Sequence, residues 1–564
     1  MKSFLAKNKR GWWIVVVAAV LAINLLASVI HKRIDLTNEK RFTISSPVKK
    51  ILAGLDEEVE VDVFLKGDMP SGFKKLSASA TELLQEFKEY ANGEIRYKVL
   101  SADDQVPGTS VTYADTLSSL GIVPIDLKVQ LKAGEQSQYI YPAALVRYKD
   151  RIQAVNLYSG PNTISNRELN SAEALLEYKF ADAIYKVVEN HKPLIAYSIG
   201  NGEPTGDKVY DLIENVLKKN YNLFRMNIAT EPVIPDTFKL LMIVKPTIRF
   251  TDAEKLKIDQ FVMRGGKVLW FIDRLEAEMD SLQIKNQVIA YDRELNLEDL
   301  LFKYGVRINP NLLMDLQCDY LRFIYGQSQD TLLPWNYFPL LESGQNSAIN
   351  KNVGLVEGKF VNSMDTTSAA GIIKTVLLHS SNNAKTIETP ALISSEENRT
   401  APVDVAYNKK NIITGVLLEG KFSSLYKNRI SQEVMDSLEQ YGTSFLTKCI
   451  NENKMIVIAD GDIVLNGALK SEVLPMGVNP QTIGTQREYQ FANKQFVENC
   501  LEYLVNTAGL NEARAKDYTL RLLDPKKTVA QRTTWQIINL ALPLLLIIIA
   551  GIIYQWWRRK RYTI

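Results

Sequence analysis

The sequence places acids and glycines directly after several short apolar runs, where an α/β protein would carry its chemistry. The run LIAYSI leads into Gly200, Asn201, Gly202 and Glu203, the run KVLWFI leads into Asp273, and the run MIVIA leads into Asp460 and Asp462. Parallel sheets collect ligands at the carboxyl ends of their strands, so these residues are candidate contacts for a ligand or a partner. Acids in such turns are also common as loop caps, and both interpretations stay open.

The turn Gly200–Gly206 does not match a nucleotide-binding loop. A Walker A loop needs a Lys followed by Ser or Thr, and a dinucleotide fingerprint needs its third glycine one residue before Gly206. The chain has three His and three Cys, and all six are scattered (His31, His191, His379, Cys318, Cys449 and Cys500). They form neither a zinc set nor a Ser-His-Asp or Cys-His arrangement. We therefore expect no catalytic residue, no metal ligand and no cofactor. Two other functions stay open at this point. One is a membrane-tethered periplasmic hydrolase that depends on carboxylates and acts on glycans, and the other is an envelope scaffold protein.

Two long apolar runs lie near the chain ends, at 12–30 and 535–557. As helices they would reach roughly 28 and 34 Å, close to the ~30 Å hydrocarbon core of a bilayer. Five of the seven Trp lie at the ends of these runs, as expected for residues at a membrane interface. More Lys and Arg lie on the terminal side of each run than on the inner side, which predicts that both termini are cytoplasmic. The body between about residues 31 and 534 is then extracytoplasmic.

The distribution of charge supports this division. The formal net charge is +3, but the two tails contain eight Lys or Arg and no acid, which leaves 59 basic and 64 acidic side chains in the body. A body of this charge is not suited to nucleic acid, whereas the basic tails suit an anionic lipid bilayer. Three Cys in 564 residues exclude a disulfide framework. Cys500 is expected to be a core residue.

Apolar periodicity predicts an α/β fold. The first part reads as strand 59–65, helix 72–91 and strand 94–100, followed by strands 125–131, 139–148 and 152–158 and helix 171–190. From residue 192, strands 194–199, 222–228, 240–244 and 268–273 alternate with helices 207–219 and 252–264. The second of these helices begins with the capping box Thr251-Asp-Ala-Glu254. Strand 455–459 and helix 493–505 resume the pattern, which is typical of a doubly wound parallel sheet.

We expect seven segments along the chain. They are a cytoplasmic tail (1–11), a transmembrane helix (12–30), a periplasmic N-terminal α/β domain (31–190), a second periplasmic α/β domain (191–510) with an irregular or β-rich insertion at about 311–430, a linker (511–534), a transmembrane helix (535–557) and a basic cytoplasmic tail (558–564).

An ordered set of motifs covers nearly the whole chain. It comprises DLTNEKRFTIS after the first apolar run, VEVDVFLKG, LIAYSIGNGEP, FVMRGGKVLWFID, VLLEGKF, IVIADGD and the basic end after the last run. In this order the motifs resemble the gliding-motility-associated GldG proteins, auxiliary substrate-binding-like components of ABC transporters in Bacteroidota.

The resemblance implies a membrane-anchored, mostly periplasmic inner-membrane subunit without catalysis. Its expected partners are a multispan permease (GldF-like) and a cytoplasmic ATPase (GldA-like), and a homodimer would suit a two-fold transporter core. The resemblance also implies an amidotransferase-like, GIFT-type fold for the central region. Asn201 stands where broader relatives often have His, which favours a ligand contact or a structural turn over catalysis there.

Overall fold

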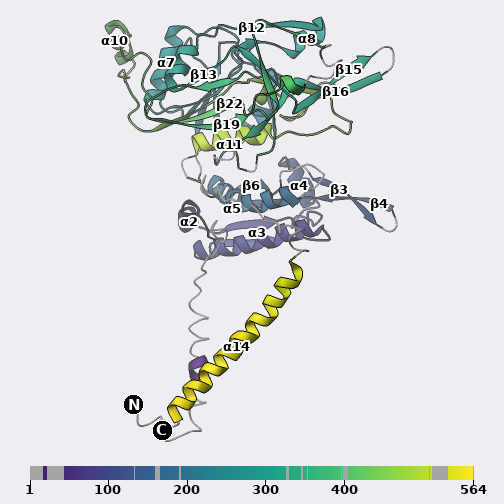
Figure 1. Ribbon diagram of the computed structural model, residues 1–564. Helices are drawn as coiled ribbons and strands as arrows, with labels where there is room; N and C mark the ends of the chain where they lie inside the picture. Colours follow the sequence, from purple (N-terminus) through teal and green to yellow (C-terminus); the bar gives the residue numbers. More distant parts are fainter. Residues whose placement is uncertain are drawn as a thin grey trace. The chain divides into compact units, whose positions relative to one another are not determined.

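The computed structural model describes residues 17–21, 43–122, 124–131, 134–158, 166–189, 192–325, 329–344, 347–351, 353–395, 397, 404–506, 509–510, 513 and 531–562. The chain divides into two compact units, 1–517 and 518–564, and each is described by itself (Figure 1). The mixed α/β character expected from the sequence is confirmed.

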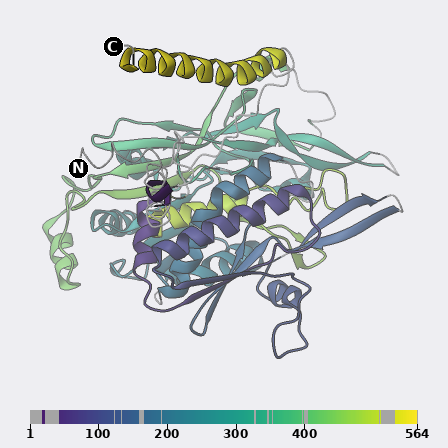
Figure 2. The same ribbon diagram turned by 90° about the horizontal axis from the view of Figure 1, so that it is seen from below.

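The N-terminal part of the first unit is built on a four-stranded sheet of order β2-β1-β5-β6. Its elements are α2 (Ser46–Ala53), β1 (Val59–Val63), α3 (Ser71–Tyr90), β2 (Ile95–Val99), α4 (Tyr113–Ser119), β3 (Ile125–Leu131), β4 (Gly134–Ile140), β5 (Ala143–Tyr148), β6 (Arg151–Asn156) and α5 (Asn166–Val188). β1 and β2 pair in parallel on either side of α3, which confirms the predicted β-α-β start. Helices α3 and α5 lie side by side and share one apolar core with the sheet (Figure 2).

The single strand predicted at 139–148 is wrong. The chain forms β4 and β5 instead, with a break at Tyr141 and Pro142. Proline has no backbone N–H to donate to a sheet ladder, so the apolar run cannot continue as one strand.

Five parallel strands form one half of the large sheet. They are β7 (Leu194–Ile199), β8 (Asn222–Asn227), β9 (Leu240–Val244), β10 (Lys267–Phe271) and β23 (Asn453–Ile458), hydrogen-bonded in the order β8-β7-β9-β10-β23. All five residues of β9 are buried, as expected for a strand covered on both faces. One face packs against segment 206–220 and α11 (Asn493–Val505), and the other packs against α7 (Asp252–Met263) and α9 (Glu298–Tyr304).

Local predictions in this half are largely confirmed. The capping box of α7 is present, with the Thr251 side chain accepting from the Glu254 amide and the Glu254 carboxylate accepting from the Thr251 amide. Cys500 is fully buried in the core. The helix predicted at 207–219 differs in its winding: a 3₁₀ turn at Gly206–Val209 leads into a π-helix at Asp211–Leu217 and a last turn at Lys218–Asn220.

The region 311–430 is rich in strands, and several of them continue the large sheet. β15 (Cys318–Tyr325), β16 (Gln329–Ser343), β19 (Ile372–His379) and β22 (Ile413–Gly420) extend it in the order β15-β16-β19-β22-β23, all in antiparallel pairs. The region is therefore hydrogen-bonded to the parallel strands and is not a separate lobe.

The second unit contains α14 (Arg532–Tyr562). Its segment Thr533–Lys560 is long and apolar enough to cross a membrane, and none of its apolar window is buried within the structure. The N-terminal span predicted at 12–30 lies almost entirely outside the described residues; within it, residues 17–21 are helical.

Candidate functional site

Charged residues that follow three adjacent parallel strands meet at one edge of the large sheet. Lys245 follows β9, Asp273 follows β10, and Asp460 and Asp462 follow β23. β10 lies between β9 and β23 and pairs in parallel with both, so the three strands end at the same edge. Together with Glu278, these residues form what we call the Lys245 cluster.

The ammonium group of Lys245 lies at the centre of this cluster. Its Nζ is 2.7 Å from Asp462 Oδ1, 3.1 Å from Asp273 Oδ2 and 3.1 Å from Glu278 Oε2. The Lys245 side chain is only 6% exposed. A buried ammonium loses its hydration, and carboxylates at these distances replace the lost water. Glu278 in turn accepts from the Arg293 guanidinium at 2.5 Å.

The backbone of Lys245 is in an unfavourable conformation. Its φ is 42°, in the left-handed region that costs a residue with a Cβ roughly 1–2 kcal/mol. Such conformations persist where surrounding contacts determine them, and they concentrate at functional or tightly constrained positions. Here the three ion pairs of the side chain supply that constraint.

Backbone amides hold the acids of the cluster in place. Asp460 Oδ1 accepts from the Asp462 amide at 2.7 Å, and Asp460 Oδ2 accepts from the Lys359 amide at 2.9 Å. The Gly461 amide donates to Asp273 Oδ1. The acidic turn after β23 is thus bonded to the end of β10 and to the segment around Lys359.

Burial shifts the protonation of the cluster. It raises the pKa of Asp273 to about 6, although Lys245 opposes this shift. Burial, followed by the charges of Asp273 and Asp462, also raises the pKa of Asp460 well above its ordinary value. Burial acts to lower the pKa of Lys245, but Asp273, Asp462 and Glu278 outweigh it and hold that pKa well above the ordinary value. With its pKa held this high, the Lys245 ammonium group stays protonated at neutral pH.

A second set of charges adjoins the cluster through Lys359. Lys359 Nζ is 3.8 Å from Glu357 Oε1, and Glu357 is only 3% exposed. Burial raises the pKa of Glu357 to about 7; Lys359 opposes the shift and Asp319 adds to it. Glu357 lies at the end of the short strand β17 (Val356–Glu357).

The three aspartates are the described residues whose spacing could suit a metal ion. Asp273, Asp460 and Asp462 each present a carboxylate oxygen within 4.8 Å of the others. Lys245 bridges two of the three, so a metal ion would have to compete with an ammonium group that is already in place. The arrangement is that of carboxylates with an internal cation.

The glycine-rich turn after β7 forms its own hydrogen-bonded unit. Glu203 accepts from the Ser198 hydroxyl at 2.6 Å and from the Asn201 amide at 2.8 Å, and burial raises its pKa. Gly200 and Gly202 have φ values of 119° and 80°, which favour glycine. A Cβ on Gly202 would lie 2.0 Å from Thr247 Oγ1. The glycines therefore serve a tight turn.

Asn201 links this turn to the next loop of the sheet. Its carbonyl oxygen accepts from the amides of Thr247 and Ile248, both at 2.8 Å, just beyond Lys245. Its side-chain amide donates to Glu254 Oε1 at 3.3 Å, whereas the side-chain oxygen is buried and has no hydrogen-bond partner. Asn201 is thus a structural contact between the loops that follow β7 and β9.

The structure brings together Asp273, Asp460 and Asp462, three of the four acids expected at the strand ends. Glu203 instead caps its own turn. Sequence reasoning missed Lys245, Glu278 and Lys359. The available signal for Lys245 was a cation placed directly between the apolar run LLMIV and Pro246, at the same kind of strand end as the acids.

Comparisons with known proteins concern most of the chain. Residues 38–147 match a family described as a domain of unknown function. An uncharacterized protein of Borreliella burgdorferi is 21% identical over 413 residues, which covers 71% of this chain and 75% of the relative. A solved structure of the mmIFT52 N-terminal domain aligns with 12% identity and a TM-score of 0.30, covering 55% of this chain and 96% of that one.

The most extensive family match lies over the large sheet and the Lys245 cluster. Residues 192–500 match the family described as ABC-type uncharacterized transport system, and this segment is more than half of the 564 residues. The protein belongs to that family of ABC-type transport systems.

Proposed function

We propose that this protein is a non-catalytic, membrane-anchored subunit of an ABC transporter complex whose body binds a substrate or a partner outside the cytoplasm. Membership of the family implies association with ABC transporter components. The observation that carries the proposal is α14, an apolar helix of membrane-spanning length that follows a folded α/β body.

The orientation proposed for the chain rests on its basic residues. Arg558, Arg559, Lys560 and Arg561 follow the last apolar run, and four Lys or Arg precede the first. Basic residues favour the cytoplasmic side, so both termini would be cytoplasmic and the α/β body periplasmic, at the inner membrane. The fold proposed for residues 191–510, a doubly wound and amidotransferase-like sheet, is compatible with a periplasmic body of this kind.

The Lys245 cluster supports a role without catalysis. A catalytic carboxylate must reach a substrate, whereas the Asp273 side chain is 6% exposed and both of its oxygens already accept from Lys245 or Gly461. The cluster ties together three strand ends, and it would stiffen the edge of the sheet that meets a ligand or partner.

The proposed partners are a GldF-like multispan permease and a GldA-like cytoplasmic ATPase. ATP hydrolysis on the other chain would supply the energy, and the membrane helices would transmit it. The ordered motifs of the sequence support a narrower placement with gliding motility or the linked secretion machinery.

Purification of the tagged full-length protein from its native membrane in mild detergent tests the proposal. We expect a multispan permease and an ABC ATPase to be recovered in stoichiometric amounts. A double variant with Arg at Leu546 and Ile549, in the middle of α14, should lose both proteins. Recovery of the tagged chain alone, or with unrelated envelope proteins, contradicts the proposal.

One observation favours a second candidate function, a carboxylate-dependent hydrolase acting on glycans. Burial raises the pKa of Asp273 to about 6, in the range of a general acid at neutral pH, but catalysis would also require the 6% exposed carboxylate to become accessible to a substrate. A screen of the full-length protein against glycan substrates, with Asp273→Asn as the comparison, decides between the two. Activity that this variant abolishes without loss of folding would establish the hydrolase.

A further inference from the structure

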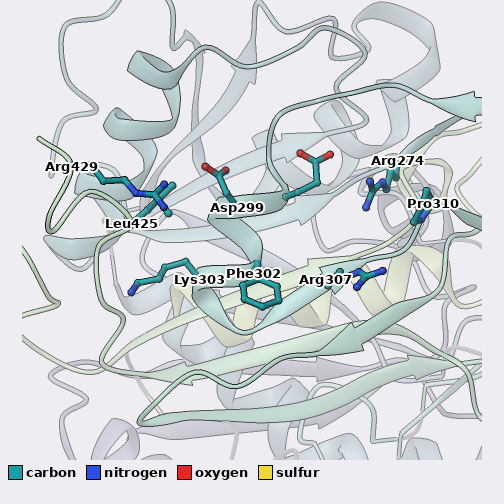
Figure 3. Close-up of a pocket in the computed structure, with 9 residues that line it drawn as sticks. Arg274, Asp299, Phe302, Lys303, Arg307, Pro310, Leu425 and Arg429 are labelled. Atoms are coloured by element: carbon teal, nitrogen blue, oxygen red, sulfur yellow. The ribbon is translucent and has the colours of Figure 1, made fainter.

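A second site lies beside the Lys245 cluster, on the side of the sheet covered by α9. It is a cavity of about 550 Å³, within the range typical of small-molecule sites. Its lining comes from four parts of the chain, namely Arg274 between β10 and β11 (Leu275–Glu276), helix α9, strand β13 (Val306–Ile308) with Pro310, and the loop at 425–429. Figure 3 shows the lining side chains.

Arg274 forms a fixed wall of this cavity. Its guanidinium donates to Asp292 Oδ2 at 2.7 and 2.9 Å and to the Ile308 carbonyl at 2.5 Å, and its side chain is 17% exposed. Arg274 directly follows Asp273, so one wall of the cavity is covalently joined to the Lys245 cluster.

Three further cations line the cavity, and Asp365, the cross-strand neighbour of Arg307, is not within ion-pair distance of it. Lys303, Arg307 and Arg429 are exposed, and none of them forms an ion pair with another described residue. They come from α9, from β13 and from the 425–429 loop. Three separate elements therefore each contribute an exposed cation to one lining, which a chance run of basic residues on one helix would not do.

The acids of the lining offset only part of this charge. Asp299 is already bonded by Lys255 Nζ, at 2.9 and 3.1 Å. Glu298 is exposed at the start of α9. Among the acids of the lining, it alone forms no ion pair with a described residue. The unpaired groups thus leave an excess of positive charge.

The middle of the cavity is apolar. Phe302 is 53% exposed, and Leu425 and Pro310 contribute further carbon surface. In Figure 3, Lys303 and Arg429 lie on one side of Phe302, and Arg307 and Arg274 lie on the other. Cations on two sides of an aromatic ring suit a ligand that has two acidic groups separated by a carbon scaffold.

We propose that this cavity binds a small organic anion with at least two acidic groups, either carboxylates or phosphates. Arg307 contacts one acidic group, Arg429 and Lys303 contact the other, and the scaffold packs on Phe302. The inference rests on the proposed function, because it names the site and the ligand class of the extracytoplasmic body.

Calorimetric titration of the full-length protein in detergent at low salt tests the site. The probes are citrate as a polycarboxylate, fructose 1,6-bisphosphate as a bisphosphate, and glucose as an uncharged control. We expect one of the two anions to bind with one-to-one stoichiometry, and the stronger of the two identifies the acidic group. Glucose should not bind, and affinity should fall as salt screens the exposed cations.

Charge-removing variants locate the binding. Arg307→Gln and Arg429→Gln should each lower the affinity for the anion about tenfold, because each removes a charge-assisted contact. The double variant should lower the affinity further. Lys285→Gln is the matched control, since Lys285 is an exposed lysine of α8 (Met279–Lys285) outside the cavity lining, and it should leave affinity unchanged.

Several outcomes overturn the inference. They are no saturable binding of either anion, or binding that Arg307→Gln and Arg429→Gln leave intact. Co-purification of the permease and ATPase is measured on the same variants. If the unaltered protein co-purifies with the permease and ATPase but binds neither anion, this inference alone is wrong. If it binds an anion but does not co-purify with them, the proposed function alone is wrong.

Discussion

Lys245 Nζ lies 2.7 Å from Asp462 Oδ1, although the two residues are 217 positions apart in the chain. One follows β9 and the other follows β23, and β10 lies between these strands. The ion pair therefore spans three strands, and Asp273 at the end of the middle strand completes it. The carboxyl edge of the sheet is held by charge in addition to its backbone ladder.

Lys245→Met should strongly destabilise the protein. The variant leaves the buried Asp273 and the partly buried Asp462 without their cation, and removing one partner of a buried ion pair costs about 3–5 kcal/mol. Urea unfolding of the full-length protein in detergent measures the loss. Lys218→Met is the control, because Lys218 pairs with Glu214 at 2.6 Å but is 53% exposed; its expected cost is below about 1 kcal/mol.

Adding Asp273→Asn to Lys245→Met should recover part of that stability, because it removes one of the uncompensated charges. If the losses of unfolding free energy in the two single variants simply add in the double variant, Lys245 and Asp273 are not energetically coupled. A Lys245→Met protein as stable as the unaltered one would contradict the structural role assigned to this lysine.

Gly461→Ala should destabilise the same edge by steric conflict. A Cβ at this position would lie 2.6 Å from Lys245 Cβ and 3.0 Å from Lys245 Cα, and a shift of Lys245 would disturb its three ion pairs. Forcing a methyl group into such a space typically costs about 1–3 kcal/mol. In Gly354→Ala the nearest atom would be Ala492 Cβ at 3.6 Å, an ordinary contact, so this control should change the unfolding free energy little.

The three aspartates of the cluster could be predicted from sequence because strand ends are local features. Asp273 and Asp460 each follow a short apolar run, and parallel strands bring such ends to one edge. Lys245 was not predicted, because a lone cation after a strand looks solvated until its neighbours are known. Those neighbours depend on the alignment of β10 and β23, which are about 190 residues apart in the chain.

Other differences have the same origin. β22 lies in the region expected to be irregular or β-rich, but its partner β23 follows more than 30 residues later, so its membership of the large sheet could not be predicted from local sequence. Glu203 looked equivalent to Asp273, yet a hydroxyl five residues before it, on Ser198, already binds it. The cations of the cavity lie on separate elements, and no spacing in the sequence relates Arg307 to Arg429.

Glu357→Gln should change how stability depends on pH. The pKa of Glu357 is about 7 in the folded protein and 4.5 without the fold, so the folded state binds the proton more tightly. The resulting stabilisation is complete below about pH 4.5 and is lost as pH rises through about 7; it amounts to roughly 3 kcal/mol. The unfolding free energy should therefore fall less between pH 5 and pH 8 in the variant than in the unaltered protein.

Glu82→Gln, at an exposed position of α3, is the control for loss of one carboxylate. It should keep the pH dependence of the unaltered protein. Parallel curves for Glu357→Gln and the unaltered protein would mean that Glu357 ionises without cost in the fold.

Two arginines in the middle of α14 should prevent it from spanning the membrane, whereas one should not. The helix contains twelve Leu and Ile, each contributing about 0.3–0.6 kcal/mol to insertion, against about 3 kcal/mol lost for each central Arg. Leu546→Arg with Ile549→Arg therefore approximately cancels the insertion free energy. A cysteine placed at Thr563 reports the outcome, because the three natural cysteines are buried. An impermeant thiol reagent added outside the inner membrane should label the double variant but not the parent. The pair Thr533→Arg and Gln555→Arg carries the same charge near the helix ends, where arginine can reach the interface, and should stay unlabelled. Labelling of the parent itself would place the C-terminal tail outside and contradict the proposed topology.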